Sequence, residues 1–462
     1  MSPTKQRTRR GTELVLLVFS VAIAMAAYAA VGLAVDGELP TGMLGYGGGL
    51  ALLFGVAHVV LRRLAPYADP VLLPAVTVIN GLGLAVIHRL DLAYVDRAER
   101  LGRDIPSAAA PAQLTWTAVG VALFVVVLLL VRDHRVLQRF TYTAMVAGLG
   151  LLLLPLLPLI GTTINGARIW IRVFGFSFQP GELAKIVLLV FFAGFLVVKR
   201  DVLALAGRRV LGVDLPRARD LGPVLVAWAA SLGVLVFERD LGTSLLFFGV
   251  FIALLYVATE RLSWLLIGVA LFLSGAFAAW SLFGHVRERV DIWLHAFAPR
   301  NVDGDSYQLV QGLFGMGTGG LLGKGLGRGR PEIVPYAQTD FIVAAIGEEL
   351  GLTGLMALLV LYAIVVQRGL RTSIAVRDSF GKLLAAGLAF SVALQVFVVV
   401  GGVTRLIPLT GLTMPFLSYG GSSLVANWAL VALLLRISDA ARRPAPAPSV
   451  SMADAKTQVV RL

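Results

Sequence analysis

Residues 180–198 read PGELAKIVLLVFFAGFLVV, a stretch that is almost entirely apolar after its first turn. A helix needs about 20 mostly apolar residues to cross a bilayer. The strands of a membrane β-barrel alternate apolar and polar residues, whereas this run is continuous. The stretch therefore predicts a membrane-spanning helix, which the charged residues Lys199 and Arg200 end.

The rest of the chain repeats this pattern, so the sequence predicts an all-α fold class, a polytopic membrane helix bundle. Of its 462 residues, 58% are hydrophobic and only 15% are charged, and the mean hydropathy is +0.84. A soluble domain has about 25% charged residues, which excludes a water-soluble globule. With no cysteine, disulfides and thiolate metal sites are excluded as well. The twelve predicted spans are 14–35, 43–61, 70–87, 114–131, 141–160, 180–198, 222–237, 242–258, 263–283, 341–366, 382–400 and 421–436.

The net charge of +13 reflects membrane topology in this interpretation, and we expect no nucleic-acid partner. Lys and Arg concentrate in cytoplasmic loops. Arg62, Arg132 and the loop 199–221 fall on one side together with the basic N-terminus, so we expect a multi-pass plasma-membrane protein with both termini cytoplasmic. The predicted divisions are a cytoplasmic N-terminus 1–13, an extra N-terminal pair of spans 14–69, a membrane core 70–436 with an extracellular loop 284–340, and a disordered cytoplasmic tail 437–462.

Residues 312–329, GLFGMGTGGLLGKGLGRG, contain nine glycines. A phosphate-binding P-loop needs Ser or Thr after its lysine, and Gly325 follows Lys324 here. Small residues also allow a loop to pack closely against helices at membrane depth. Close packing is therefore the preferred interpretation of this segment.

Several charged residues lie within or beside the predicted spans, where charges are usually paired or functional. Glu182 and Lys185 are three residues apart and lie on the same face of a helix, which favours an ion pair. Arg168 precedes this helix and is a candidate for binding an anionic headgroup. Of the adjacent Glu348 and Glu349, at least one must face the bundle interior.

Other candidates lie at the predicted outer ends of the spans. Asp240 is expected to cap the helix that follows it. Arg405 is a third candidate cation, and Ser422 and Ser423 bring hydroxyl groups to the same interface. Within the long loop, Asp303 and Asp305 flank a glycine in a segment that also fits a solvated turn.

Six motifs in this order resemble the SEDS family of bacterial cell-wall synthesis, and most closely its RodA branch in high-GC Gram-positive bacteria. The motifs are QPGELAK (179–185), DLGTS (240–244), YQLVQG (307–312), GKGLG (323–327), TDFIVAAIGEELG (339–351, which includes Asp340) and PFLSYGGSS (415–423). The resemblance runs over about 141–436. It implies a ten-helix core, which the two leading spans extend to about twelve.

The resemblance also implies an activity. SEDS proteins are peptidoglycan glycosyltransferases that polymerise lipid II at the outer face of the plasma membrane, with a class B penicillin-binding protein as partner. Their catalytic aspartate lies in a pattern like D-P-x-G-x-G-Y-Q. Aligned without gaps on Tyr307-Gln308, that aspartate falls on Asn301, which cannot act as a base. Asp303 is the nearest carboxylate and the expected general base, with Asp305 as the alternative.

The reaction fits the residue types. A general base takes the proton of the attacking sugar hydroxyl. The pyrophosphate leaving group needs positive charge, for which Arg168, Lys185 and Arg405 are candidates, with a divalent cation (Mg²⁺ or Mn²⁺) and no organic cofactor. A flippase for lipid-linked precursors, a non-enzymatic scaffold and a division role like that of FtsW are the alternative functions. A flippase needs a charged path into the cytoplasmic half of the bundle.

Overall fold

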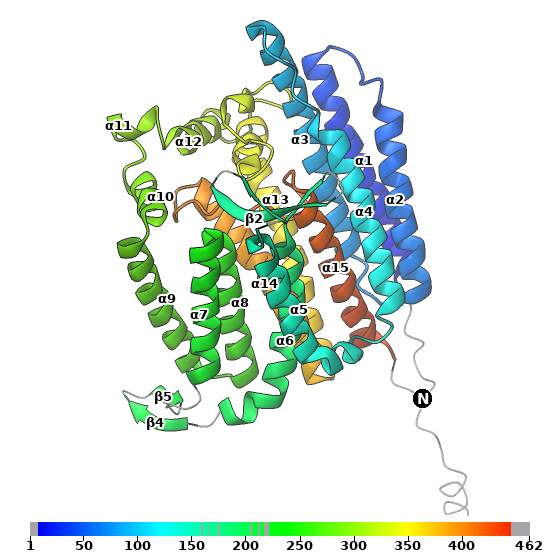
Figure 1. The fold of residues 1–462 in the computed structure, drawn as a ribbon. Coiled ribbons are helices and arrows are strands. Elements are labelled where there is room, and N and C mark those ends of the chain that lie inside the picture. The colour runs from blue at the N-terminus through cyan, green and yellow to red at the C-terminus, as the bar shows by residue number, and fades with distance from the viewer. Residues whose placement is uncertain are drawn as a thin grey trace, which may run out of the picture.

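The computed structural model describes residues 8–444, except 159, 165, 174–175, 204–205, 211–212 and 217–220. Within this part, all twelve predicted spans are helices of one bundle (Figure 1). They are α1 (Arg10–Val35), α2 (Met43–Leu64), α3 (Leu72–Leu101), α4 (Ala109–Leu130), α5 (Thr141–Leu153), α6 (Pro180–Leu203), α7 (Gly222–Glu238), α8 (Leu241–Thr259), α9 (Leu262–Leu282), α13 (Ile342–Ala375), α14 (Ser379–Val403) and α15 (Gly421–Arg442). Eleven of them are long and apolar enough to cross a membrane, with α5 counted together with its flanking 3₁₀ turns η1 (His134–Phe140) and η2 (Leu154–Leu156), while α7 is shorter.

The two ends of the bundle differ in what they carry. The connection between α9 and α13 contains α10 (Gly284–Leu294), α11 (Pro299–Val302), α12 (Tyr307–Gly319) and the 3₁₀ turn η4 (Pro331–Ile333), and we call this side the loop end. At the opposite side, the terminal end, Arg10 of α1 donates to the Pro66 carbonyl and Arg442 of α15 pairs with Asp69. The first residue of α1 and the last residue of α15 therefore lie on the same side of the bundle (Figure 1).

The bundle also carries two short antiparallel sheets in its connections. At the loop end, β1 (Gly161–Ile164), β2 (Ala167–Val173) and β3 (Phe176–Phe178) pair in the order β1-β2-β3 between α5 and α6. At the terminal end, β4 (Ala206–Val210) pairs with β5 (Val213–Pro216). The segment 161–178 is rich in β-branched and aromatic residues, which favour strands, but too short to span a membrane.

Several helices extend beyond the predicted spans, because an apolar run marks only the part of a helix that lies at membrane depth. Helix α3 continues to Leu101 through charged residues. Helix α15 continues to Arg442, with Ile437 and Asp439 buried, so the predicted disorder is wrong for 437–442. The remainder of that predicted tail, from residue 445, and residues 1–7 lie outside the described residues.

Helix α13 is interrupted at Gly351, where φ is +67°. The Gly-rich segment 319–325 completes the backbone hydrogen bonds around this break. Leu352 N donates to Gly320 O at 2.9 Å, and Gly325 N donates to Glu349 O at 2.8 Å. Irregular backbone inside a membrane must find such partners within the protein.

The glycines of this segment are required by close backbone contact. A Cβ added at Gly319 would lie 2.1 Å from Gly347 O, and one at Gly323 would lie 2.3 Å from Glu349 O. No side chain fits at either place. The packing interpretation of the Gly-rich segment is therefore confirmed.

Aromatic side chains form the centre of the core between α2, α4 and α15. The Trp428 ring lies 5.6 Å from the Phe54 ring and 5.9 Å from the Phe124 ring. All three side chains are fully buried. Helix α2 is thus part of the same core as the last helix of the bundle.

At the terminal end, Asp378 caps α14 and gives a pH-dependent contribution to stability. Burial by itself raises the pKa of Asp378, but hydrogen bonds from His134 (2.9 Å) and Gly381 N (2.7 Å) outweigh it and hold the pKa at about 2. Because this value is below the ordinary 3.8, the ionised carboxylate stabilises the fold above about pH 4, and the contribution is lost as the pH falls toward 2. We expect Asp378→Asn to cost about 2 kcal/mol at pH 7 and almost nothing at pH 2. Thermal unfolding in detergent at both pH values measures this, and an equal loss at both would contradict it.

Candidate active site at the loop end of the bundle

The predicted ion pair of Glu182 and Lys185 is present on α6. Lys185 Nζ donates to Glu182 Oε2 at 3.0 Å and to Gln395 Oε1 of α14 at 2.9 Å. The Gln395 amide in turn donates to Thr413 O at 2.9 Å, which ties the pair to the loop after α14. Glu182 and Lys185 are 7% and 4% exposed, so the charges are paired inside the bundle. Sequence reasoning missed Gln395, although a lone amide in an apolar span is a signal for such a contact.

Asp240 lies directly before α8, and Asp340 lies two positions before α13. Asp240 caps α8 as predicted, because its carboxylate accepts from Thr243 N at 2.9 Å and from Thr243 Oγ1 at 2.6 Å. Burial raises the pKa of Asp240; Glu182 raises it further, and Arg289 lowers it. Burial likewise raises the pKa of Asp340, and Arg289 again lowers it. The positive charge of Arg289 therefore acts on both carboxyl groups, without an ion pair to either of them among the described residues.

Arg289 of α10 was not among the sequence candidates. One of its N–H groups donates to Leu409 O at 2.7 Å. The residue also lines a cavity of about 410 Å³ whose walls are mostly apolar side chains of α7, α8, α9 and α14. The loop helix α10 thus brings a cation to the edge of an apolar cavity, which no local sequence signal indicated.

The other two predicted cations have structural contacts instead. Arg405 donates to the carbonyls of Trp293 and Leu294 at 2.8 and 2.9 Å and lies 5.4 Å above the Phe297 ring. It holds α10 against the loop after α14. Arg168 donates to the carbonyls of Pro155 and Leu157 at 3.0 and 3.2 Å.

These contacts fasten Arg168 of β2 to the 3₁₀ turn η2. The contacts of Arg168 and Arg405 lie outside the cluster of Glu182, Lys185 and Asp240. The structure therefore does not support the prediction that all three cations converge on one anion.

Ser422 and Ser423 are buried at the start of α15 and have different partners. Ser422 Oγ accepts from Gln179 N at 2.9 Å, which joins the PFLSYGGSS segment to the beginning of α6. Ser423 binds within its own helix, since Asn427 Nδ2 donates to its carbonyl at 2.8 Å. Ser422 is thus next to the helix of the Glu182–Lys185 pair, whereas Ser423 is a packing residue.

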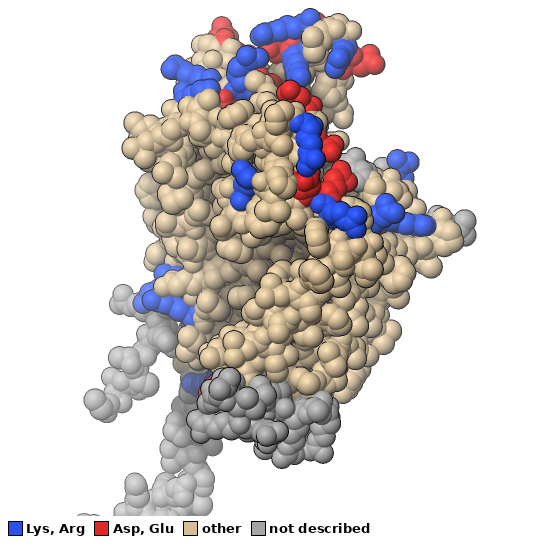
Figure 2. Space-filling model, turned by 90° about the vertical axis from the view of Figure 1, so that its left-hand side faces the viewer, with Lys and Arg blue, Asp and Glu red and all other residues tan. Residues whose placement is uncertain are grey.

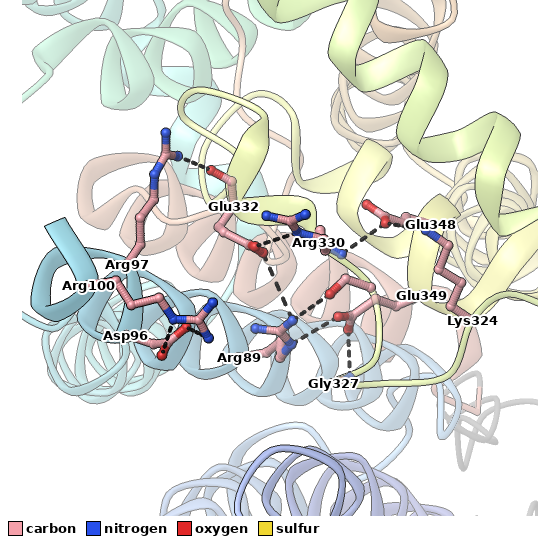
Figure 3. Close-up of polar contacts among 11 residues, drawn as sticks. Arg89, Asp96, Arg97, Arg100, Lys324, Gly327, Arg330, Glu332, Glu348 and Glu349 are labelled. Atoms are coloured by element: carbon pink, nitrogen blue, oxygen red, sulfur yellow. Dashed lines mark hydrogen bonds and ion pairs between the residues drawn. The ribbon is translucent and has the colours of Figure 1, made fainter.

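Glu348 and Glu349 both face the interior and anchor the Gly-rich segment (Figure 3). Glu348 Oε1 accepts from Lys324 Nζ at 3.1 Å and from Arg330 N at 2.9 Å. Glu349 Oε1 accepts from Arg89 Nε of α3 at 3.0 Å. The pair of carboxylates therefore positions the loop and lies away from the Lys185 cluster.

The loop aspartates lie between α11 and α12. Asp303 directly follows α11, and both Asp303 and Asp305 are exposed. Neither has a side-chain hydrogen bond or ion pair to another of the described residues. A free, accessible carboxylate can accept a proton from an incoming hydroxyl group.

Asp291 of α10 is the other carboxylate of this region, and sequence reasoning missed it. Hydrogen bonds from Asn301 (3.2 Å) and His295 (2.8 Å) lower the pKa of Asp291, and Arg300 lies 3.1 Å from it. Its carboxylate is therefore occupied, in contrast to that of Asp303.

Comparisons with known proteins match this arrangement. The family model described as "Cell cycle protein", which covers FtsW, RodA and SpoVE, matches residues 70–443. The chain belongs to the SEDS family. The peptidoglycan glycosyltransferase RodA of Mycobacterium tuberculosis is 55% identical over 438 residues, which cover 95% of this chain and 92% of that protein.

Solved structures of the SEDS family share the fold. A peptidoglycan synthase complex, studied for its coordination of polymerization and crosslinking, contains a chain with a TM-score of 0.54 and 27% identity, covering 87% of this chain and 98% of that one. A variant of the rod shape determining protein RodA of Thermus thermophilus also has a TM-score of 0.54, with 26% identity, covering 82% and 99%.

The structure shows the surroundings of Asn301 and Asp303, the two positions that the sequence comparison singles out. Asn301, on which the pattern's aspartate falls without gaps, is only 6% exposed. Its amide donates to Asp291 Oδ2 at 3.2 Å and to His295 O at 3.1 Å, so it is a structural residue. Asp303, two residues later in the sequence, is exposed and has no partner among the described residues.

Proposed function

We propose that the chain is a peptidoglycan glycosyltransferase that polymerises lipid II at the outer face of the plasma membrane during cell elongation. The 55% identity to a mycobacterial RodA over 95% of the chain carries this proposal, because that relative is named for this activity. The loop end supports it: Asp303 is exposed and has no partner among the described residues, and Arg289 lines an apolar cavity at the same end of the bundle.

In the proposed reaction, a sugar hydroxyl of the acceptor attacks the anomeric carbon of the donor. Asp303 takes the hydroxyl proton as general base. Pyrophosphate is already a stable anion, so no general acid is required, unlike in glycosidases with two carboxylates. Arg289 at the edge of the apolar cavity supports a lipid-linked substrate, since one end of the site is cationic and the rest is apolar. Lys185 is buried on α6 and donates to Glu182.

We propose that a divalent cation, Mg²⁺ or Mn²⁺, binds together with the pyrophosphate group of the substrate. No three His, Asp or Glu side chains gather as a metal site in the described ranges of the chain. Mg²⁺ is commonly held by one or two carboxylates together with substrate phosphates. We propose that such a cation enters with the phosphate groups of the substrate and neutralises the leaving group.

The proposed partner is a class B penicillin-binding protein that cross-links the product. The solved synthase complex that contains a similar chain supports this pairing, because that complex combines polymerization with crosslinking. On the face shown in Figure 2, charged side chains gather toward the loop end and a broad area below them carries almost none, which supports insertion in a lipid bilayer.

We also propose that both termini are cytoplasmic and that the loop end is extracellular. Cysteine can report this topology because the chain contains none. Gly304→Cys is the suitable position: Gly304 is exposed, and the nearest atom to an added Cβ is 3.5 Å away. We expect labelling by a membrane-impermeant maleimide in intact cells. Labelling only after permeabilisation would reverse the topology.

Polymerisation of labelled lipid II by the purified protein, alone and with its partner, tests the activity. We expect glycan chains on a gel with the partner present. A protein that makes no polymer yet moves lipid II across vesicle membranes would be a flippase. One that does neither but raises polymerisation by another synthase would be a scaffold. Rescue of division in cells depleted of FtsW would favour the division role.

A further inference from the structure

The first two helices lie outside the family model, which begins at residue 70, yet α1 is fastened to the core helix α3 along its length. Ser20 Oγ donates to Pro74 O at 3.0 Å. A Cβ added at Gly81 would lie 2.4 Å from the Ala24 Cβ, so the two backbones approach closely. Small residues at a helix interface allow such close approach, which favours association of helices in a membrane.

The terminal end of α1 is fixed by a buried charge cluster. Arg10 donates to the carbonyls of Pro66 and Ala68 in the connection to α3 and pairs with Glu13. Glu13 Oε1 lies 2.7 Å from His58 Nδ1 of α2. These contacts therefore fix the position of α1 along the axis of α3.

The other end of α1 reaches the Gly-rich segment. Gly327 has φ of +85°, and a Cβ added there would lie 2.7 Å from the Ala34 Cβ and 3.3 Å from Val31 O. The turn at Gly327 therefore lies directly against the last turns of α1, with no room for a side chain between them.

The same turn is held by the core from its other sides (Figure 3). Gly327 N donates to Glu349 Oε2 at 3.1 Å, and Glu349 accepts from Arg89 Nε. Arg89 also donates to Gly329 O at 2.8 Å. The segment is therefore enclosed by α1, α3 and α13, and α1 is the only one of these three helices that lies outside the family core.

We propose that α1 is a positioning element of the synthase: its loop end, at Ala34, sets the 320–330 segment and thereby the outer loop that carries Asp303. This inference rests on the proposed function. The segment follows α12, whose first residue comes four positions after Asp303, so a displaced turn moves the reacting carboxylate. A shift of about 1 Å in a reacting group can cost up to about 10²-fold in rate.

Enlarging Ala34 tests this role against a matched control on the same helix. Ala34→Leu should push the turn at Gly327 away and reduce polymerisation by about 10²-fold, mainly in kcat. Ala26→Leu, on the exposed face of α1, makes the same change where lipid accommodates it and should leave polymerisation unchanged. Ala34→Ser keeps the small size and should retain activity.

A readout independent of activity separates this proposal from the proposed function. Leu326 is half-buried beside the turn, and Leu326→Cys is the single thiol in an otherwise cysteine-free chain. In that background, Ala34→Leu should raise the labelling rate severalfold with an unchanged unfolding temperature, and Ala26→Leu should not. Unchanged labelling together with unchanged polymerisation in Ala34→Leu would overturn the role of α1. A loss of polymerisation that is accompanied by a lower unfolding temperature would overturn it as well. Faster labelling in a chain whose unsubstituted form makes no polymer would leave the positioning intact and refute the proposed function.

Discussion

Polymer formation by Asp303→Asn should fall by about 10²–10⁴-fold, the usual contribution of a general base. Asparagine keeps the size of the side chain but cannot accept the proton of the sugar hydroxyl. Asp303 is exposed and has no ion-pair partner among the described residues, so the substitution breaks no contact of the fold. Binding of lipid II should persist, since Arg289 and the apolar cavity remain. Single-turnover polymerisation and a separate lipid II binding assay measure the two effects.

Asp305→Asn is the matched control, because Asp305 lies in the same exposed turn. It should polymerise at a nearly normal rate. The reverse result, a normal Asp303→Asn and an inactive Asp305→Asn, would move the base by two residues. Normal rates in both variants would remove the loop carboxylates from the chemistry and favour a transporter.

Lys185→Ala should destabilise the protein by roughly 3–5 kcal/mol, because it leaves Glu182 as an uncompensated buried charge. Lys185 is 4% exposed and bonds both Glu182 and Gln395, so the loss affects two helices. Arg62→Ala removes an exposed charge near the terminal end and should cost almost nothing. Denaturant or thermal unfolding in detergent compares them. A Lys185→Ala variant as stable as Arg62→Ala would show that the pair contributes little.

The double variant Glu182→Leu/Lys185→Met separates structure from function at this site. Replacing both members of a buried pair by apolar residues often restores stability. If the pair acts in the reaction, the double variant should regain its unfolding temperature but remain deficient in polymerisation. Recovery of both would assign the pair to folding alone.

The number and order of the spanning helices, but not the loop helices α10, α11 and α12, could be predicted from the sequence, because lipid imposes a local rule. At membrane depth every backbone polar group must be hydrogen-bonded within the protein, which favours helices. Such a helix is recognisable in the sequence as a long run of apolar residues. The Glu182–Lys185 pair and the Asp240 cap were likewise predictable, since both partners lie within one turn of the same helix.

Contacts between distant segments could be decided only by the tertiary structure. Arg168 and Arg405 resemble anion-binding residues in sequence, but carbonyl groups brought close by folding occupy their guanidinium groups. Arg289 carried no local signal, and the amide of Gln395 did not reveal its partner, because Leu409 and Lys185 lie more than one hundred positions away from them in the chain.

The role of Glu349 was also beyond the sequence, which indicated only that one of the two adjacent glutamates faces inward. Its partner Arg89 lies 260 positions away on α3. The hydropathy of a segment depends only on the residues of that segment. A hydrogen bond or ion pair depends on which two segments the fold places side by side. The sequence by itself therefore determined the spans and the family, and the packing of the helices decided which charges meet.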